Sequence, residues 1–139
     1  MKDINLSIEE IAAEETLGIR RDVMWPGKPL EYVKLQDDSE GLHFGLKLNG
    51  ELVTVVSLFV KNEEAQFRKL ATISAHQGNG YASLMLDHII TLSQNKGVTK
   101  LWCNARVNKT GFYHKIGMYE TDQKFSKGGI DYVIMEKNI

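Results

Sequence analysis

The stretch His76-Gln77-Gly78-Asn79-Gly80-Tyr81-Ala82 lies where an alternating, strand-like segment ends and an amphipathic helical pattern begins. The segment before it, Phe67 to Ile73, alternates as a strand does. After it, apolar side chains recur at the spacing of one buried helix face: Tyr81, Leu84, Met85, His88, Ile89 and Leu92. The glycines therefore lie at the turn, where the backbone can approach a ligand and the first N-H groups of the helix point outward. Such a turn suits a phosphate or pyrophosphate.

The turn is also explained, taken alone, as a tight connection between a strand and a helix. A P-loop is not predicted, because no Gly-Lys-Ser/Thr follows to supply a lysine and a hydroxyl for terminal phosphates and magnesium. A Rossmann motif is not predicted either. Ser83 stands where the third glycine belongs, and the next strand, near Leu101 to Asn104, offers no acidic residue for a ribose.

The motif resembles the acyl-CoA signature Gln/Arg-x-x-Gly-x-Gly/Ala of the GNAT superfamily of N-acyltransferases, matched by Gln77, Gly80 and Ala82. A second stretch, Phe112-Tyr113-His114-Lys115-Ile116-Gly117-Met118, is similar to the family's Phe-Tyr-x-Lys-x-Gly-Phe, with methionine in place of the last aromatic residue. The order and the separation of the two motifs also agree. The resemblance extends from about Phe44 to Ile134.

The resemblance implies a fold of class α/β (α+β), with a mixed, largely antiparallel central sheet and helices on both faces. It implies a single N-acetyltransferase domain over residues 1–139. Local patterns agree with this fold. Two strands, Leu42 to Leu48 and Glu51 to Val60, are predicted on either side of the hairpin signal Asn49-Gly50, and a third, Ala65 to Ile73, leads into the glycine turn.

The N-terminal third predicts a short strand over Ile4 to Ile8. A helix over Ile8 to Glu15 follows, with Ser7 as its cap and Glu10 completing a capping box. A second helical piece runs from Thr16 to Met24 and is stopped by Pro26 and Pro29, and the segment Gly27 to Gly41 is a loop.

The C-terminal part predicts a strand, a short helix and a hairpin. Gly97 is expected as a left-handed cap after the glycine-turn helix. The predicted elements are a strand over Thr99 to Asn104, a helix over Thr110 to Ile116 ended by Gly117, and strands over Met118 to Phe125 and Ile130 to Met135.

Composition favours an ordinary globular domain. The chain has 139 residues and is 42% hydrophobic, which is enough for a core. Seventeen basic and eighteen acidic residues give a net charge of -1 without a basic block, so no nucleic-acid partner is expected. The single cysteine, Cys103, excludes an intramolecular disulfide and a thiolate cluster for zinc, which favours a reducing compartment.

No membrane association is expected. The longest apolar run, Leu52 to Val60, is interrupted by Thr54 and Ser57 and is too short to span a bilayer. No signal peptide is recognised, so the protein is expected to be soluble and cytoplasmic. Exposed edge strands in a sheet of this kind favour a homodimer.

The resemblance implies acetyl-CoA as the acyl donor. The backbone N-H groups of the glycine turn would bind its pyrophosphate, and the strand before the turn would offer backbone groups to the pantetheine and the thioester. That strand would equally form core in any α/β protein, and Asn108 is either a contact with the CoA arm or a turn residue. The expected contacts are Leu70, Ala71, Thr72, Gln77, Gly78, Asn79, Gly80, Tyr81, Ala82 and Asn108.

The activity implied is transfer of an acetyl group to a primary amine of a small molecule or peptide, by direct attack in a ternary complex. The resemblance assigns to Tyr113 the protonation of the CoA thiolate as it leaves. Without the resemblance, the residues favour Tyr113 as a core aromatic beside Phe112 on an amphipathic helix. No general base is identified among Glu63, Glu64, His43 and His76. The alternative function is an acyl-CoA-binding sensor of the same fold.

The resemblance implies that residues from about Arg20 to Asp38 cover the acceptor site. Arg20 and Arg21 are candidates to bind a substrate carboxylate, Trp25 to form a wall of the pocket, and Asn104, next to Cys103 at a strand end, to line the acyl site. Each has a structural alternative. The arginines can stabilise the end of a helix, Trp25 can fill the core, and Cys103 can be a buried thiol.

Overall fold

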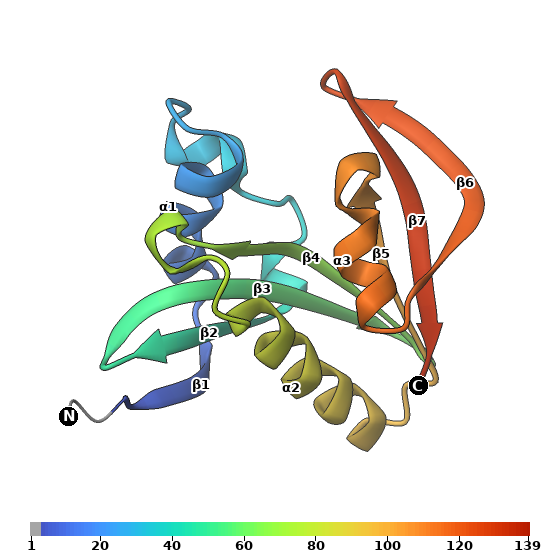
Figure 1. The fold of residues 1–139 in the computed structure, drawn as a ribbon, viewed down its shortest axis with the longest axis horizontal. Helices are drawn as coiled ribbons and strands as arrows, with labels where there is room; N and C mark the ends of the chain where they lie inside the picture. Colours follow the sequence, from blue (N-terminus) through green and yellow to red (C-terminus); the bar gives the residue numbers. More distant parts are fainter. Residues whose placement is uncertain (1–3) are drawn as a thin grey trace. The chain divides into compact units, whose positions relative to one another are not determined.

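The computed structural model describes residues 4–139. In chain order the elements (Figure 1) are β1 (Leu6–Ile11), α1 (Ala13–Met24), η1 (Leu30–Val33), η2 (Asp38–Glu40), β2 (Leu42–Leu48), β3 (Glu51–Lys61), β4 (Glu64–Thr72), η3 (Ser74–His76), α2 (Tyr81–Asn95), β5 (Lys100–Arg106), η4 (Val107–Lys109), α3 (Thr110–Lys115), β6 (Tyr119–Lys127) and β7 (Ile130–Asn138), where η marks a 3-10 helix. None of the helices in these residues is long and apolar enough to cross a membrane.

The strands are hydrogen-bonded in the order β1-β2-β3-β4-β5-β7-β6. β4 and β5 pair in parallel, whereas β1 with β2, β2 with β3, β5 with β7 and β6 with β7 pair antiparallel. The predicted mixed, largely antiparallel sheet is therefore confirmed. The described residues form two compact units: residues 4–59 with 69–89 (the first unit) and residues 60–68 with 90–139 (the second unit). A single N-acetyltransferase domain over the whole chain stays a prediction.

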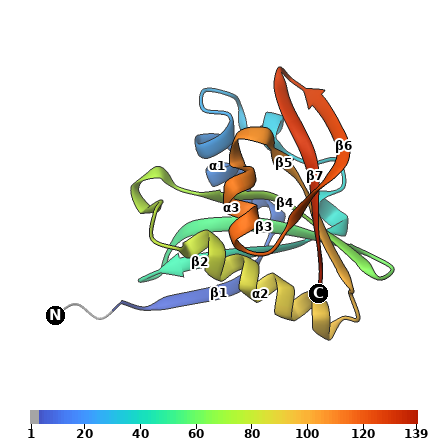
Figure 2. The same ribbon diagram turned by 45° about the vertical axis from the view of Figure 1, so that its right-hand side comes forward.

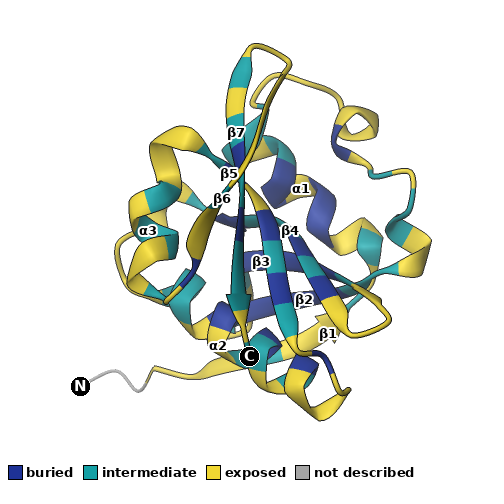
Figure 3. Cartoon of the chain, turned by 90° about the vertical axis from the view of Figure 1, so that its right-hand side faces the viewer, coloured by how far each residue is buried: buried dark blue, intermediate teal, exposed yellow. Residues whose placement is uncertain are grey.

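In the first unit, α1 and α2 cover opposite faces of the strands. Successive side chains of a strand point to opposite faces, and β2 shows this directly. The side chain of His43 faces α1 through a hydrogen-bonded network with Arg20, and the ring of Phe44 packs on His88 of α2, with ring centroids 5.5 Å apart. The consecutive buried residues of β3, Val53–Leu58, thus contribute to both layers, which explains their near-continuous burial (Figure 3).

The N-terminal part begins with a strand, as predicted, but the strand lies at Leu6–Ile11 and not at Ile4 to Ile8, and the helix predicted after it was wrong. Residues Leu6–Ile11 are strand β1, antiparallel to β2 from Leu6 opposite Leu48 to Ile11 opposite His43. The predicted helix over Ile8–Glu15 does not form, because pairing satisfies the otherwise open edge of β2. A contact of the capping-box type exists further along the chain. At the start of α1, the Glu15 carboxylate accepts a hydrogen bond of 2.8 Å from the Ala12 N-H.

The turns predicted from glycine are confirmed. Asn49 and Gly50 both have positive φ (51° and 84°), which is the geometry of a tight two-residue hairpin between β2 and β3. Gly97 (φ 82°) ends α2, and Gly117 (φ 88°) ends α3. The predicted buried face of α2 needs one correction. Leu84 is 43% exposed, and Leu86, which the prediction omitted, is fully buried.

The second unit is built around the antiparallel pair β5 and β7, with β6 on the far side of β7 (Figure 2). β5 alternates between buried and more exposed positions, with Leu101, Cys103 and Ala105 buried. At the end of α3, the Lys137 ammonium of β7 donates a 2.8 Å hydrogen bond to the carbonyl of Ile116. This contact satisfies a helix carbonyl that has no partner within the helix.

Candidate functional site

The glycine loop of the first unit is exposed and open. Residues 77–80 are all exposed, and the backbones of Gly78 and Gly80 have φ of 83° and 82°, a region that favours glycine. A Cβ placed on either glycine would meet no atom within 4 Å. The positive φ therefore favours glycine at both positions, and the described residues leave the space in front of them open.

Gly80 directly precedes α2, which begins at Tyr81. Its carbonyl accepts the Leu84 N-H at 3.1 Å, which is the first hydrogen bond of the helix. A glycine cap has no side-chain oxygen, so it leaves the N-H groups of the first turn available to an outside acceptor. No carboxylate occurs between Ser74 and Ser83, so nothing within this stretch opposes an anion placed there. The arrangement suits a phosphate-bearing ligand.

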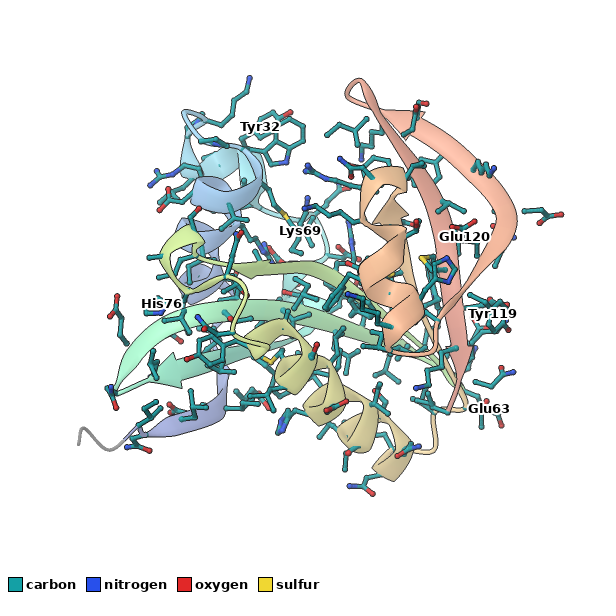
Figure 4. The ribbon with its side chains drawn as sticks, viewed as in Figure 1. Tyr32, Glu63, Lys69, His76, Tyr119 and Glu120 are labelled. Carbon is teal, nitrogen blue, oxygen red and sulfur yellow. The ribbon has the colours of Figure 1, made fainter. Side chains whose placement is uncertain are left out.

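The loop is anchored to the end of β4 by side-chain amides. Gln77 donates from Nε2 to the Thr72 carbonyl at 2.9 Å, and Asn79 donates from Nδ2 to the His76 carbonyl at 3.1 Å. The ring of His76, which lies on this loop (Figure 4), packs 6.5 Å from that of Tyr81. The structure therefore uses the Gln77 side chain to hold the loop, and leaves the backbone of the loop to face outward.

Three residues of β4 before the loop were predicted as backbone contacts. Ala71 packs with Ile19 and Val55 on the α1 face, and the Thr72 hydroxyl is hydrogen-bonded at 2.9 Å to that of Thr54 on the other face. Leu70 is half-buried. Their side chains are thus largely structural, and any ligand contact would be made by their backbone.

Tyr113 belongs to the second unit. It lies on α3 and packs on Phe67, with ring centroids 5.9 Å apart, and on Phe112, at 5.1 Å. Burial, together with the nearby Cys103, raises the pKa of the Tyr113 hydroxyl well above its ordinary value of 10, and the Arg106 charge opposes this only in part. The phenol is therefore protonated throughout the neutral range, as a proton donor must be.

The remaining candidates of the second unit differ in accessibility. Cys103 is buried, and burial raises the pKa of its thiol to about 12, so it is a poor nucleophile at neutral pH. Asn104 is exposed and lies within β5, which continues to Arg106, so the predicted strand end at Asn104 was wrong. Asn108 is exposed in the 3-10 turn before α3.

The prediction that Arg20 grips a substrate was wrong. Arg20 is fully buried within α1, and its guanidinium binds the Asp38 carboxylate through two hydrogen bonds of 2.9 Å. It also donates to the Val33 carbonyl at 3.1 Å and to the Ser57 hydroxyl at 2.8 Å. A charge this deep requires a fixed partner. The Nη1 and Nη2 groups of the guanidinium are thus occupied by partners inside the protein.

His43 completes this network and is excluded as an accessible general base. The ring is 4% exposed, with Nε2 2.8 Å from the Asp38 carbonyl and Nδ1 2.7 Å from the Ser57 hydroxyl. Because a carbonyl can only accept, Nε2 carries the hydrogen, and in the neutral ring Nδ1 accepts from Ser57. Sequence reasoning missed this network. Its signals were polar residues, Ser57 and His43, at positions where apolar strands predict core.

Arg21 and Trp25 stay accessible candidates in the first unit. Arg21 has a half-exposed side chain that donates to Asp22 at 3.1 Å. Trp25 is half-buried at the end of α1, and its ring meets the edge of Tyr32 with centroids 5.2 Å apart. Lys28 places its ammonium 4.9 Å from the centre of the Tyr32 ring. Among the general-base candidates, Glu64 lies 3.7 Å from Lys100 in an exposed ion pair, and Glu63 is exposed at the turn before β4.

The buried ion pair predicts an acid-dependent loss of stability. Burial alone would raise the pKa of Asp38, but hydrogen bonds from Arg20 and the Leu35 N-H, with the Arg20 charge, hold it below its ordinary value of 3.8. A lowered pKa in the folded state stabilises the protein above pH ~4, and this contribution is lost as the pH falls through the folded pKa. We expect Asp38→Asn to lower the free energy of unfolding by about 2 kcal/mol at pH 7.

Urea denaturation at several pH values tests this expectation. The difference between wild type and Asp38→Asn should shrink below pH ~4. The exposed Glu40, in the same segment, supplies the control Glu40→Gln, whose smaller effect should show no such acid dependence. A difference for Asp38→Asn that is constant from pH 7 to pH 3 would contradict the assignment.

Comparison with known proteins agrees with this geometry. The sequence model of the family described as "Acetyltransferase (GNAT) domain" matches residues 28–139. The uncharacterized N-acetyltransferase YitI of Bacillus subtilis is 28% identical over 96% of this chain and 97% of its own length. The [ribosomal protein bS18]-alanine N-acetyltransferase of Haemophilus influenzae is 28% identical over 68% of this chain and 67% of its own length.

The fold agrees as well. The crystal structure of a GNAT family acetyltransferase from Elizabethkingia anophelis with acetyl-CoA bound superposes with a TM-score of 0.79 at 19% identity, over 97% of this chain and 99% of that one. The chain therefore belongs to the GNAT acetyltransferase family. Transfer of an acyl group is the chemistry that this family membership assigns to it.

Proposed function

We propose that the protein transfers an acetyl group from acetyl-CoA to a primary amine by direct attack within a ternary complex. The observation that carries the proposal is the loop from Gln77 to Ala82, which leads into α2 with two left-handed glycines and open space around them. CoA presents a pyrophosphate that such a turn can bind through backbone alone. The acetyl-CoA complex of the Elizabethkingia relative supports this donor.

The chemistry needs a proton donor and no covalent intermediate. The amine nitrogen attacks the thioester carbon, the C–S bond breaks, and the thiolate takes a proton as it leaves. Tyr113 is the proposed donor, since its phenol is protonated at neutral pH. An acyl-enzyme on Cys103 is disfavoured because burial keeps that thiol neutral. The base that removes the amine's proton is assigned to no residue, and His43 is too deeply buried to serve.

A primary amine on a small molecule or a peptide is the proposed acceptor. The Haemophilus relative, by its name, acetylates an alanine of a ribosomal protein, which supports an amine acceptor without naming one for this chain. Arg21 and Trp25 of the first unit are proposed acceptor contacts, since each has half-exposed side-chain surface. Asn104 of the second unit is exposed and stays a separate proposal as a residue of the acyl site. The cytoplasm as the site of action and a homodimer also remain proposals.

Calorimetric titration with acetyl-CoA tests the proposal, with CoA, ATP and NADH for comparison. We expect micromolar binding of acetyl-CoA and CoA, and none of ATP or NADH. A panel of amines read out by release of free thiol then separates an enzyme from the alternative, an acyl-CoA sensor. A sensor would bind acetyl-CoA but release no thiol beyond the rate without protein. Absence of acetyl-CoA binding would refute both functions.

A further inference from the structure

The segment from Pro29 to Gly41 (the strap) has little core of its own. Of its residues only Val33 is buried, and Leu30 and Tyr32 are 42% and 50% exposed. Tyr32 lies at the surface of the first unit (Figure 4). A segment with so few buried apolar contacts belongs to the least stable part of a fold and can open separately from the rest.

The backbone-to-backbone hydrogen bonds of the strap are local, whereas the carbonyls of Val33 and Asp38 accept from the side chains of Arg20 and His43. The local hydrogen bonds close short turns inside the strap itself: Tyr32 to Pro29, Lys34 to Glu31, Asp38 to Leu35, Glu40 to Asp37 and Gly41 to Asp38, in each case N-H to carbonyl. Such turns hold the shape of the strap without joining it to a sheet. Just before the strap, Gly27 has φ of 87° and open space around it, which lets the chain change direction there.

Asp38 makes several polar connections between the strap and the rest of the first unit, beside the hydrogen bond from Arg20 to the Val33 carbonyl. The Asp38 carboxylate takes both bonds from Arg20 of α1 and also holds the Leu35 N-H of the strap at 2.9 Å. The Asp38 carbonyl accepts from His43 of β2. Ser57 of β3 links the two partners, since it contacts Arg20 at 2.8 Å and His43 at 2.7 Å. Asp38 thus contacts α1 and β2 directly, and it is linked to β3 through Arg20 and His43.

The hydrogen bonding of Arg20 in this network is already incomplete. The Arg20 Nε is buried without a hydrogen-bond partner among the described residues, so the guanidinium already lacks one bond. Loss of the Asp38 charge would leave the cation buried without a counter-ion, which is strongly unfavourable. The structural change that relieves this penalty at the lowest cost in free energy is movement of the strap away from Arg20, so that water can hydrate the guanidinium. We propose that the strap opens as one unit and that Asp38 is the latch that holds it closed.

Hydrogen exchange on the full chain, read by mass spectrometry at one pH, tests the latch. We expect Asp38→Asn to speed exchange of the strap amides by at least ~10-fold, since removal of one partner of a buried ion pair is strongly unfavourable. Amides of β2 and β3 should keep their protection. Glu40→Gln removes the same charge from an exposed position of the strap and should leave its exchange unchanged.

Ser57→Ala gives a second test if Asp38→Asn does not fold. It keeps the ion pair but removes the hydroxyl between Arg20 and His43, so strap exchange should rise by less than in Asp38→Asn and by more than in Glu40→Gln. Unchanged strap exchange in the folded variants would overturn the latch. Equal acceleration in the strap, β2 and β3 would overturn independent opening, because it would report global unfolding.

A kinetic experiment tests whether the strap also affects catalysis. It rests on the proposed function and on the expectation from the sequence that this segment covers the acceptor site. Asp38→Asn should then raise the KM for the amine several-fold while the Kd for acetyl-CoA stays the same. Faster strap exchange with an unchanged amine KM would leave the latch intact and reject only its link to the acceptor. If the wild-type protein does not bind acetyl-CoA, the proposed function is rejected, and the conclusion from hydrogen exchange still holds.

Discussion

Tyr113→Phe is expected to lower kcat by about 10²- to 10⁴-fold, the range that general acid catalysis typically contributes. The substitution removes one oxygen and keeps the ring, which packs on Phe67 and Phe112. The Kd for acetyl-CoA should therefore change little. The measurement is steady-state thiol release together with calorimetric titration of acetyl-CoA. Tyr132, a half-buried tyrosine stacked on Phe125 in the same unit, supplies the matched control Tyr132→Phe.

The raised pKa of Tyr113 also predicts a pH range in which ionisation of this residue should not change kcat. Its ordinary pKa is 10, and burial moves the pKa higher, so the phenol loses its proton only in strongly alkaline solution. Any fall of kcat between pH 8 and 10 should therefore come from another group, and should persist in Tyr113→Phe. Wild-type kcat in Tyr113→Phe would mean that water or another residue protonates the thiolate.

Local signals in the sequence were sufficient for the hairpins and the glycine turns. Asn49-Gly50 and Gly97 have the left-handed backbone that their positions predicted, because that conformation depends on the residue itself and its immediate neighbours. The N-terminal strand was predicted only over Ile4 to Ile8, and its continuation to Ile11 could not be obtained in the same way. Residues Leu6–Ile11 become a strand because β2 offers an unpaired edge some forty residues later in the chain, and no local pattern records that partner.

Arg20 shows a different limit of prediction from the sequence. It lies three residues after Leu17 and four before Met24, so the helical spacing already places it on the apolar face of α1. An arginine there is either a buried ion pair or a residue of a polar cavity, and only the position of Asp38, eighteen residues later, decides between them. For the glycine loop, by contrast, sequence and structure agree on open backbone at a helix start, and the ligand contacts there are still a proposal.

Gly80→Leu is expected to weaken acetyl-CoA binding by about 10- to 100-fold, or roughly 1.4 to 2.8 kcal/mol. At φ of 82°, a side chain strains the backbone that aims the first N-H groups of α2, and it also occupies the open space in front of them. Calorimetric titration gives the affinity, and urea denaturation gives the stability of the same sample.

Substitution of Gly97 is the control that separates the effect of backbone strain from the effect of a lost ligand contact. Gly97 has the same φ of 82° and the same empty surroundings, but it follows the end of α2 and not its start. Gly97→Leu should therefore cost a similar amount of stability, on the order of 1 to 2 kcal/mol, without changing the Kd for acetyl-CoA. Equal loss of affinity in both variants would mean that binding follows general stability. Unchanged affinity in a folded Gly80→Leu would show that this turn does not contact the pyrophosphate.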